Sequence, residues 1–194
     1  MPPDPEFVQA VRAACDKHGA LFIADEVQAG AGRTGKMWSI EHAGVEPDMM
    51  TFGKGIGGDL PMAGLMMRRD LAVQPDDHSQ PQTFAANALS AEVCMTNLEI
   101  IERDGLVQRA AEVGDEAMQR LKAAAKELEI IGDVRGRGLM IGVELVVNRE
   151  TREPLSADKT GAIVIAMLQR GVIMVPCGRY GNVLRLMPSL TIPR

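Results

Sequence analysis

The chain has 194 residues, with 21 Lys+Arg against 26 Asp+Glu, a formal net charge of -5 and 46% hydrophobic residues. This composition excludes wholesale disorder, and the mild acidity and 3% aromatic content argue against a nucleic-acid partner, which needs a basic surface or a base-stacking platform. Three separated cysteines without metal-ligand spacing predict free thiols in a cytoplasmic protein with no metal site, and no apolar run reaches the roughly 20 residues of a membrane span.

The first part of the chain predicts alternating helices and strands. Asp4 is a helix N-cap before Pro5, and Gly19 is a helix stop. The elements that follow are a buried strand over 20–24, a glycine-rich loop, a short helix over 38–43, a second buried strand over 48–52 and a third strand over 63–67. This order predicts an α/β sheet with functional groups at the carboxyl ends of its strands.

The second part of the chain has a different texture. A polar loop over 70–82 precedes helices over 87–103 and 106–128, and the first of these has four candidate core positions, Leu89, Val93, Leu98 and Ile101. Beyond them we expect a strand over 134–147, a helix near 157–170, and strands near 172–176 and 183–187. These patterns predict two domains, 1–104 with a mostly parallel sheet and 105–194 with a small α+β fold.

A glycine-rich segment between the first two strands, GAGRTGK at 30–36, matches both the GxGxxG and the GxxxxGK nucleotide-binding patterns. A P-loop requires Ser or Thr after its lysine, and Met37 stands there. The dinucleotide motif requires its glycines directly at the strand end, and Asp25 and Glu26 come between. A turn explains these glycines better, and a P-loop nucleotide-binding protein stays as an alternative.

Two charged residues follow the predicted buried strands. Lys54, flanked by glycines, is a solvated loop lysine, a phosphate contact or an amine that forms a Schiff base, and Asp25 is a loop cap or a functional acid. Because both end strands at one expected sheet edge, they match the needs of pyridoxal 5'-phosphate (PLP). This cofactor requires a lysine for its aldehyde and an acid at its pyridinium nitrogen.

A third charged residue, Arg185, lies within the apolar strand over 183–187. An arginine in such a run either extends its head to solvent or binds a carboxylate through two hydrogen bonds, and both possibilities stay open. The three histidines, at 18, 42 and 78, form no cluster in the sequence, so no chemistry is assigned to them.

Taken together, several motifs in order resemble the class III, ornithine/4-aminobutyrate-type, PLP-dependent aminotransferases. They are LFIADEVQ at 21–28 with GRTG at 32–35, PD at 47–48 with GKGIGG at 53–58 and LP at 60–61, TF at 83–84 with Asn87, GRGLMIGVEL at 136–145, and NVLRL at 182–186 with Pro188. The chain departs from the family pattern at Asp59 and Ala86, where the family usually has glycine.

The resemblance implies a role for each matching residue. Lys54 would form the Schiff base with PLP and move the proton at the substrate carbon, and Asp25 would bind the pyridinium nitrogen. Val27 would pack on the cofactor ring and Gln28 would lie near its 3-oxygen. Thr83 would bind phosphate, reaching the partner subunit's cofactor, and Arg185 would hold a substrate carboxylate.

The resemblance also implies a partial fold-type I aminotransferase. The expected reaction is ping-pong transfer of an amino group from an amino acid, ω-amino acid or diamine to a 2-oxo acid such as 2-oxoglutarate, by a homodimer in the full-length form. A racemase or aminomutase activity on the same fold stays open. Because the family's chains are far longer, we expect this chain to lack the N-terminal half and the C-terminal helix, and to be weakly active or inactive alone.

Overall fold

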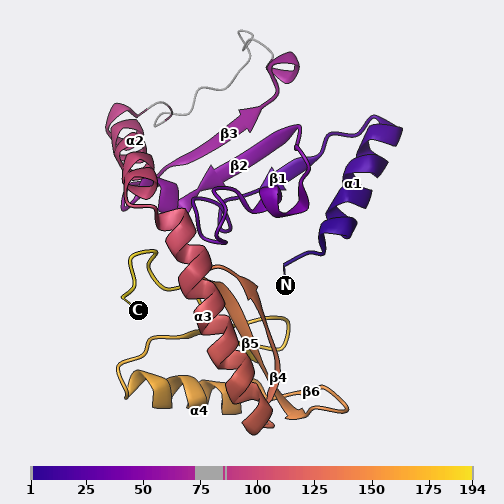
Figure 1. The fold of residues 1–194 in the computed structure, drawn as a ribbon, viewed down its shortest axis with the longest axis vertical. Coiled ribbons are helices and arrows are strands. Elements are labelled where there is room, and N and C mark those ends of the chain that lie inside the picture. The colour runs from indigo at the N-terminus through magenta and orange to yellow at the C-terminus, as the bar shows by residue number, and fades with distance from the viewer. Residues whose placement is uncertain (1, 73–84, 86, 194) are drawn as a thin grey trace. The chain divides into compact units, whose positions relative to one another are not determined.

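The protein forms two compact units, Pro3–Val107 (the N-terminal unit) and Gln108–Arg194 (the C-terminal unit) (Figure 1). Their structure comes from a computed structural model that describes residues 2–72, 85 and 87–193. In this described part of the chain, no helix combines the length and apolarity needed to cross a bilayer.

The N-terminal unit begins with the predicted helix. α1 (Pro5–His18) starts at Asp4, whose side chain accepts the N–H of Glu6 at 3.0 Å, and ends at Gly19, whose φ of 65° suits glycine. The remaining described elements are β1 (Ile23–Asp25), η1 (Ser39–Ala43), β2 (Met49–Gly53), η2 (Lys54–Gly57), β3 (Ala63–Met67), η3 (Arg69–Leu71) and α2 (Ala88–Arg103). The predicted helix at 38–43 and the strands at 48–52 and 63–67 are therefore confirmed within one or two residues.

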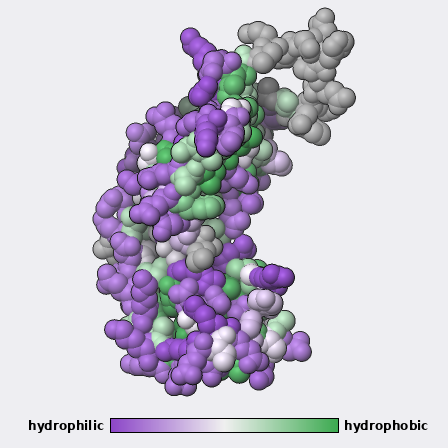
Figure 2. All heavy atoms as spheres, turned by 90° about the vertical axis from the view of Figure 1, so that its right-hand side faces the viewer, coloured by the Kyte–Doolittle hydropathy of each residue, from purple (hydrophilic) through white to green (hydrophobic). Residues whose placement is uncertain are grey.

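The described sheet of this unit has the order β1-β2-β3, with β1 parallel and β3 antiparallel to β2. Ala24 and Met50 are buried on one face, whereas Ile23, Leu65 and Met67 are exposed on the other. The expectation of a fully buried first strand is therefore wrong for alternate residues, because the described chain covers only one face of β1 and β2, and on that face Met66 of β3 is still exposed. Apolar areas on the surface of this unit are visible in the upper part of Figure 2.

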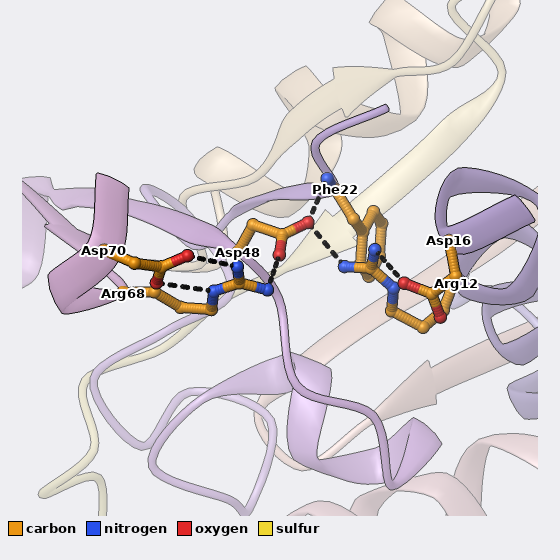
Figure 3. A network of polar contacts seen from close by, with 6 residues as sticks. All are labelled: Arg12, Asp16, Phe22, Asp48, Arg68 and Asp70. Carbon is orange, nitrogen blue, oxygen red and sulfur yellow. Dashed lines mark hydrogen bonds and ion pairs between the residues drawn. The ribbon is translucent and has the colours of Figure 1, made fainter. Parts of the chain in front are cut away.

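Asp48, just before β2, is the polar centre of the N-terminal unit (Figure 3). Its side chain is only 4% exposed and accepts hydrogen bonds from the N–H of Phe22 at 2.7 Å, from Arg12 at 2.6 Å and from Arg68 at 2.7 Å. These donors hold the pKa of the Asp48 carboxyl below its usual range, the Phe22 N–H first and Arg12 next. The network joins α1, the entry to β1 and the exit from β3.

α2 confirms the predicted helix at 87–103, with Asn87 as its N-cap, but its buried face differs from the prediction. Leu89 is 66% exposed, whereas Cys94 is 5% exposed and Ile101 is buried. Cys94 comes five positions after Leu89, which places the two side chains about 140° apart around a helix. The packed face of α2 therefore follows Cys94 and Ile101, and the core assignment of Leu89 is wrong.

The C-terminal unit combines an antiparallel sheet with two helices. Its elements are α3 (Leu106–Glu127), which enters the unit at Gln108, then β4 (Ile131–Arg137), β5 (Met140–Asn148), β6 (Glu153–Pro154), α4 (Ala157–Leu168), β7 (Val175–Cys177) and β8 (Val183–Leu186). The described strands have the order β4-β5-β8-β7, with β6 beside β5. The core lies on the sheet face that α3 and α4 cover, with Ile141, Val143 and Leu184 at its centre.

Two sequence predictions for this unit need correction. The predicted single strand over 134–147 is a hairpin of β4 and β5, because Gly138 adopts a φ of 52° and reverses the chain. The strand expected near 172–176 begins only at Val175. The helices at 106–128 and 157–170 and the strand at 183–187 are confirmed within two residues.

Gly114 of α3 lies directly against the β4–β5 turn. A Cβ atom at this position would lie 2.2 Å from the carbonyl oxygen of Gly138. Gly161 of α4 offers a contrast, since a Cβ there would meet nothing within 4 Å. Close backbone packing thus requires glycine at position 114 and does not require it at position 161.

We predict that Asp48→Asn lowers the free energy of unfolding near neutral pH and that its difference from the wild type narrows in acid. Because the pKa of Asp48 is lowered in the folded state, its contribution is present above the ordinary pKa of about 3.9 and is lost as the pH falls through the lowered value. Urea unfolding at a series of pH values measures both effects.

The matched control for Asp48→Asn is Asp16→Asn, which removes an exposed partner of the same Arg12. An exposed pair contributes about 1 kcal/mol or less, so this variant should differ little from the wild type. A difference between wild type and Asp48→Asn that stays constant down to strong acid would contradict the prediction.

A second prediction compares two helical glycines of the C-terminal unit. Gly114→Ala should lower the free energy of unfolding by about 1–3 kcal/mol through overpacking against the Gly138 backbone. Gly161→Ala should raise it by about 1 kcal/mol, because alanine is the better helix former. Equal effects of the two substitutions in denaturant titrations would show that the contact at Gly114 is not limiting.

Candidate active site

The carboxyl ends of two adjacent parallel strands bring Asp25 and Lys54 to one edge of the sheet. Asp25 is the last residue of β1 and pairs in register with Thr51 of β2. Lys54 follows β2 directly after Gly53. With a rise of about 3.3 Å per residue, Asp25 and Lys54 lie roughly 10 Å apart along the strand direction. An acid and an amine thus share one end of the sheet.

Asp25 is exposed and is oriented by its neighbours. Its Oδ1 accepts the N–H of Val27 at 3.0 Å, a local turn that Asp favours, and the hydroxyl of Thr51 at 3.5 Å. Oδ2 makes no hydrogen bond within the part of the chain that the structure describes. The side chain is therefore fixed by one oxygen and can accept a donor with the other.

Lys54 has a backbone conformation that lysine rarely adopts, with a φ of 50°. Such a left-handed conformation costs a non-glycine residue about 1–2 kcal/mol and is concentrated at functional sites. Its side chain is exposed and, across the described residues, forms no hydrogen bond or ion pair. It lines a cleft of about 1050 Å³ together with Asp59 and neutral residues of β3 and α2.

Glu26, next to Asp25, organises the loop beside this edge. It is only 3% exposed and accepts the N–H groups of Ser39 at 2.9 Å and Ile40 at 2.6 Å, at the start of η1. Burial raises the pKa of Glu26, and these two bonds oppose that rise. The sequence assigned no role to Glu26, although alternation along a strand indicates that it points away from Asp25, toward the covered face.

The glycine-rich loop packs as a series of turns. A Cβ atom at Gly30 would lie 2.8 Å from Trp38, and Gly32 and Gly35 both have a φ of 83°. The first helical residue after Lys36 is Ser39, so no helix begins where a P-loop would place one. The loop geometry favours the turn interpretation over nucleotide binding.

The other predicted cofactor residues are placed only in part. Val27 and Gln28 are half-buried in the turn directly after Asp25. Thr83 lies outside the described residues. Thr51, which the sequence did not single out, contacts Asp25 because the register of β1 and β2 sets them opposite one another.

Arg185 belongs to the C-terminal unit, on β8 between Gly142 of β5 and Val175 of β7. It is half-buried and, among the described residues, makes no hydrogen bond or ion pair. Arg135, across Gly142 on β4, contacts both Asp133 and Glu144. Arg185 is thus an arginine whose guanidinium can bind a carboxylate.

The conformation of Lys54 leads to a stability prediction. Lys54→Gly should be about 1 kcal/mol more stable than Lys54→Ala, because glycine adopts a φ of 50° without steric cost. At Lys36, which has no positive φ, the alanine variant should be the more stable one. The same order of glycine and alanine at both positions, measured by denaturant unfolding, would contradict the assignment of strain to Lys54.

We compared the sequence and the structure with known proteins to find the family of the chain. The model of the family "Aminotransferase class-III" matches residues 1–194. The chain is 40% identical to 4-aminobutyrate aminotransferase of Escherichia coli strain K12, over 97% of this chain and 44% of the relative. It is also 40% identical to leucine/methionine racemase of Thermococcus litoralis, over 100% of this chain and 43% of that protein.

Among solved structures, an amine transaminase from an uncultivated Pseudomonas species, in its PLP-bound form, matches with a TM-score of 0.91 at 31% identity. The match covers 99% of this chain and 45% of that one. The chain thus spans less than half the length of these proteins, and its α/β architecture is part of the fold-type I aminotransferase fold, as predicted. The chain belongs to the class-III aminotransferase family.

Proposed function

We propose that the protein is a PLP-dependent transaminase that moves an amino group from an amino acid, ω-amino acid or diamine to a 2-oxo acid such as 2-oxoglutarate. The observation that carries the proposal is the placement of Lys54 and Asp25 at the carboxyl ends of adjacent parallel strands. The proposal is also supported by the membership of the chain in the class-III family and by its structural similarity to a PLP-bound amine transaminase.

The residues present fit the cofactor. PLP requires an amine for its aldehyde and an acid for its ring nitrogen, and the separation of Lys54 from Asp25 is one that a lysine arm and an aromatic ring can bridge. The free Oδ2 of Asp25 provides the acceptor, and Lys54 provides the amine at the same end of the sheet. When bound, PLP supplies a sink for the electrons left when a substrate carbon loses a proton.

In this proposal each residue has a defined task. The Nζ of Lys54 would hold the cofactor's aldehyde carbon and, once a substrate amine had replaced it there, would move the proton at the substrate carbon. Asp25 keeps the ring nitrogen protonated, and its bond from Val27 N–H fixes the direction of its second oxygen. Val27 would pack on the ring, and Gln28 would lie near its 3-oxygen. Arg185 binds a substrate carboxylate through its fork of N–H donors.

The wider organisation is also part of the proposal. We assign residues 1–104 to the second half of a cofactor-binding large domain and 105–194 to a small C-terminal domain. The whole protein would act as a homodimer in which Thr83 binds the phosphate of the partner subunit's cofactor. The free thiols of Cys15, Cys94 and Cys177 favour a cytoplasmic location.

A racemase is the second candidate function, because a leucine/methionine racemase is as similar in sequence as the 4-aminobutyrate aminotransferase. A racemase returns the proton to the same carbon and needs no 2-oxo acid. Formation of glutamate from 2-oxoglutarate with 4-aminobutyrate supports the transaminase. Inversion of leucine or methionine without an oxo product supports the racemase.

The cofactor assignment is tested by covalent trapping. After incubation with PLP and reduction with borohydride, peptide mapping of the protein should place the main adduct on Lys54. Lys54→Ala should lose this adduct, whereas Lys36→Ala should keep it. Equal labelling of Lys36 and Lys54 in the wild type, or an unchanged yield in Lys54→Ala, would contradict the assignment.

A further inference from the structure

The turn that carries Lys54 is tied to α2 by one side chain. Nδ2 of Asn97 donates to the carbonyl oxygen of Gly55 at 2.6 Å and approaches that of Ile56 at 3.3 Å. These carbonyls belong to the two residues that directly follow Lys54. The contact joins positions 41 and 42 residues apart in the sequence, within the N-terminal unit.

The same turn is packed from several sides. Ile56 is only 2% exposed, and a Cβ atom at Gly57 would lie 2.8 Å from Met62. On the α2 side, a Cβ at Gly58 would lie 3.4 Å from Val93. These contacts hold the end of the turn, whereas Asn97 reaches the carbonyls nearest to Lys54.

Asn97 is an unusual residue for its position in α2. It lies three residues after buried Cys94 and four before buried Ile101, so it shares the packed face of the helix. Asparagine is a poor helix former, and a polar group on a packed face is unfavourable unless it is hydrogen-bonded. The two carbonyl oxygens after Lys54 satisfy that requirement.

We propose that Asn97 is a positioning residue that holds the Lys54 turn in its left-handed conformation and so keeps the lysine amine directed to the cleft. The inference rests on the proposed function, in which Lys54 binds PLP. Without the Asn97 amide, the carbonyl of Ile56 loses that donor and the carbonyl of Gly55 keeps only the N–H of Gly58 at 3.3 Å, so the φ of Lys54 can relax. The amine would then be presented less often in the reactive position.

The test compares Asn97→Leu, which removes the amide at similar size, with Gln9→Met. The matched control also removes an amide, which donates from α1 to the carbonyl of Ala43 at 2.8 Å, away from Lys54. The first readout is the initial rate of borohydride-trapped PLP labelling at Lys54 relative to Lys36. The second is amide hydrogen exchange over residues 54–58 relative to the β4–β5 hairpin, which neither Asn97 nor Gln9 contacts, and it involves no cofactor.

We expect Asn97→Leu to lower the relative labelling of Lys54 about tenfold and to speed exchange over 54–58 by a similar factor, as the loss of one or two net hydrogen bonds implies. Gln9→Met should leave both within about twofold of the wild type. Asn97→Asp, which keeps the shape but lacks the donor, should resemble Asn97→Leu, and melting curves establish that each variant is folded.

The outcomes separate the two proposals. Unchanged exchange and labelling in folded Asn97→Leu and Asn97→Asp would overturn the role of Asn97. So would equal losses in Gln9→Met, since they would reflect general destabilisation. No preferential labelling of Lys54 in the wild type would overturn the proposed function, whereas exchange over 54–58 would still report whether Asn97 holds the turn.

Discussion

Asp48 brings three separate segments of the N-terminal unit to one buried carboxylate: Arg12 from α1, the N–H of Phe22 at the entry to β1, and Arg68 after β3 (Figure 3). A carboxylate withdrawn from water is unfavourable unless donors surround it, so each donor has to be in place when the unit is folded. The contact between Phe22 and Asp48 also fixes where β1 and β2 begin beside one another. Their register follows from this start, and with it the positions of their carboxyl ends.

At those carboxyl ends the backbone departs from strand geometry, at the residues that we propose bind the cofactor. Asp25 is turned by the N–H of Val27, and Lys54 adopts a left-handed conformation immediately after β2. Backbone strain of this kind persists only where the surroundings determine the conformation. The surroundings here are the buried Ile56, the close approach of Gly57 to Met62, and α2. The packing of the turn after β2 thus maintains the strained backbone conformation of Lys54.

The C-terminal unit is built around an antiparallel sheet. Its core lies between one face of an antiparallel sheet and the helices α3 and α4, and Gly114 allows α3 to approach the β4–β5 turn. Arg185 lies opposite Gly142, a residue without a side chain, and its guanidinium makes no hydrogen bond or ion pair with a described residue. The face of the sheet thus offers an arginine that is not already committed to an ion pair, in contrast to Arg135.

The sequence by itself determined the elements with strong local signals, such as α1 between Asp4 and Gly19, and it placed Asp25 and Lys54 at strand ends. Its ordered motifs also identified the family. Only the tertiary structure decided that Leu89 lies outside the core, that residues 134–147 form a hairpin, and that Asn97 reaches the turn after Lys54. Caps and turns act through hydrogen bonds and dihedral angles within a few residues, so the sequence displays them directly. Burial and the Asn97 contact depend on residues that are distant in the chain, and folding alone brings those together.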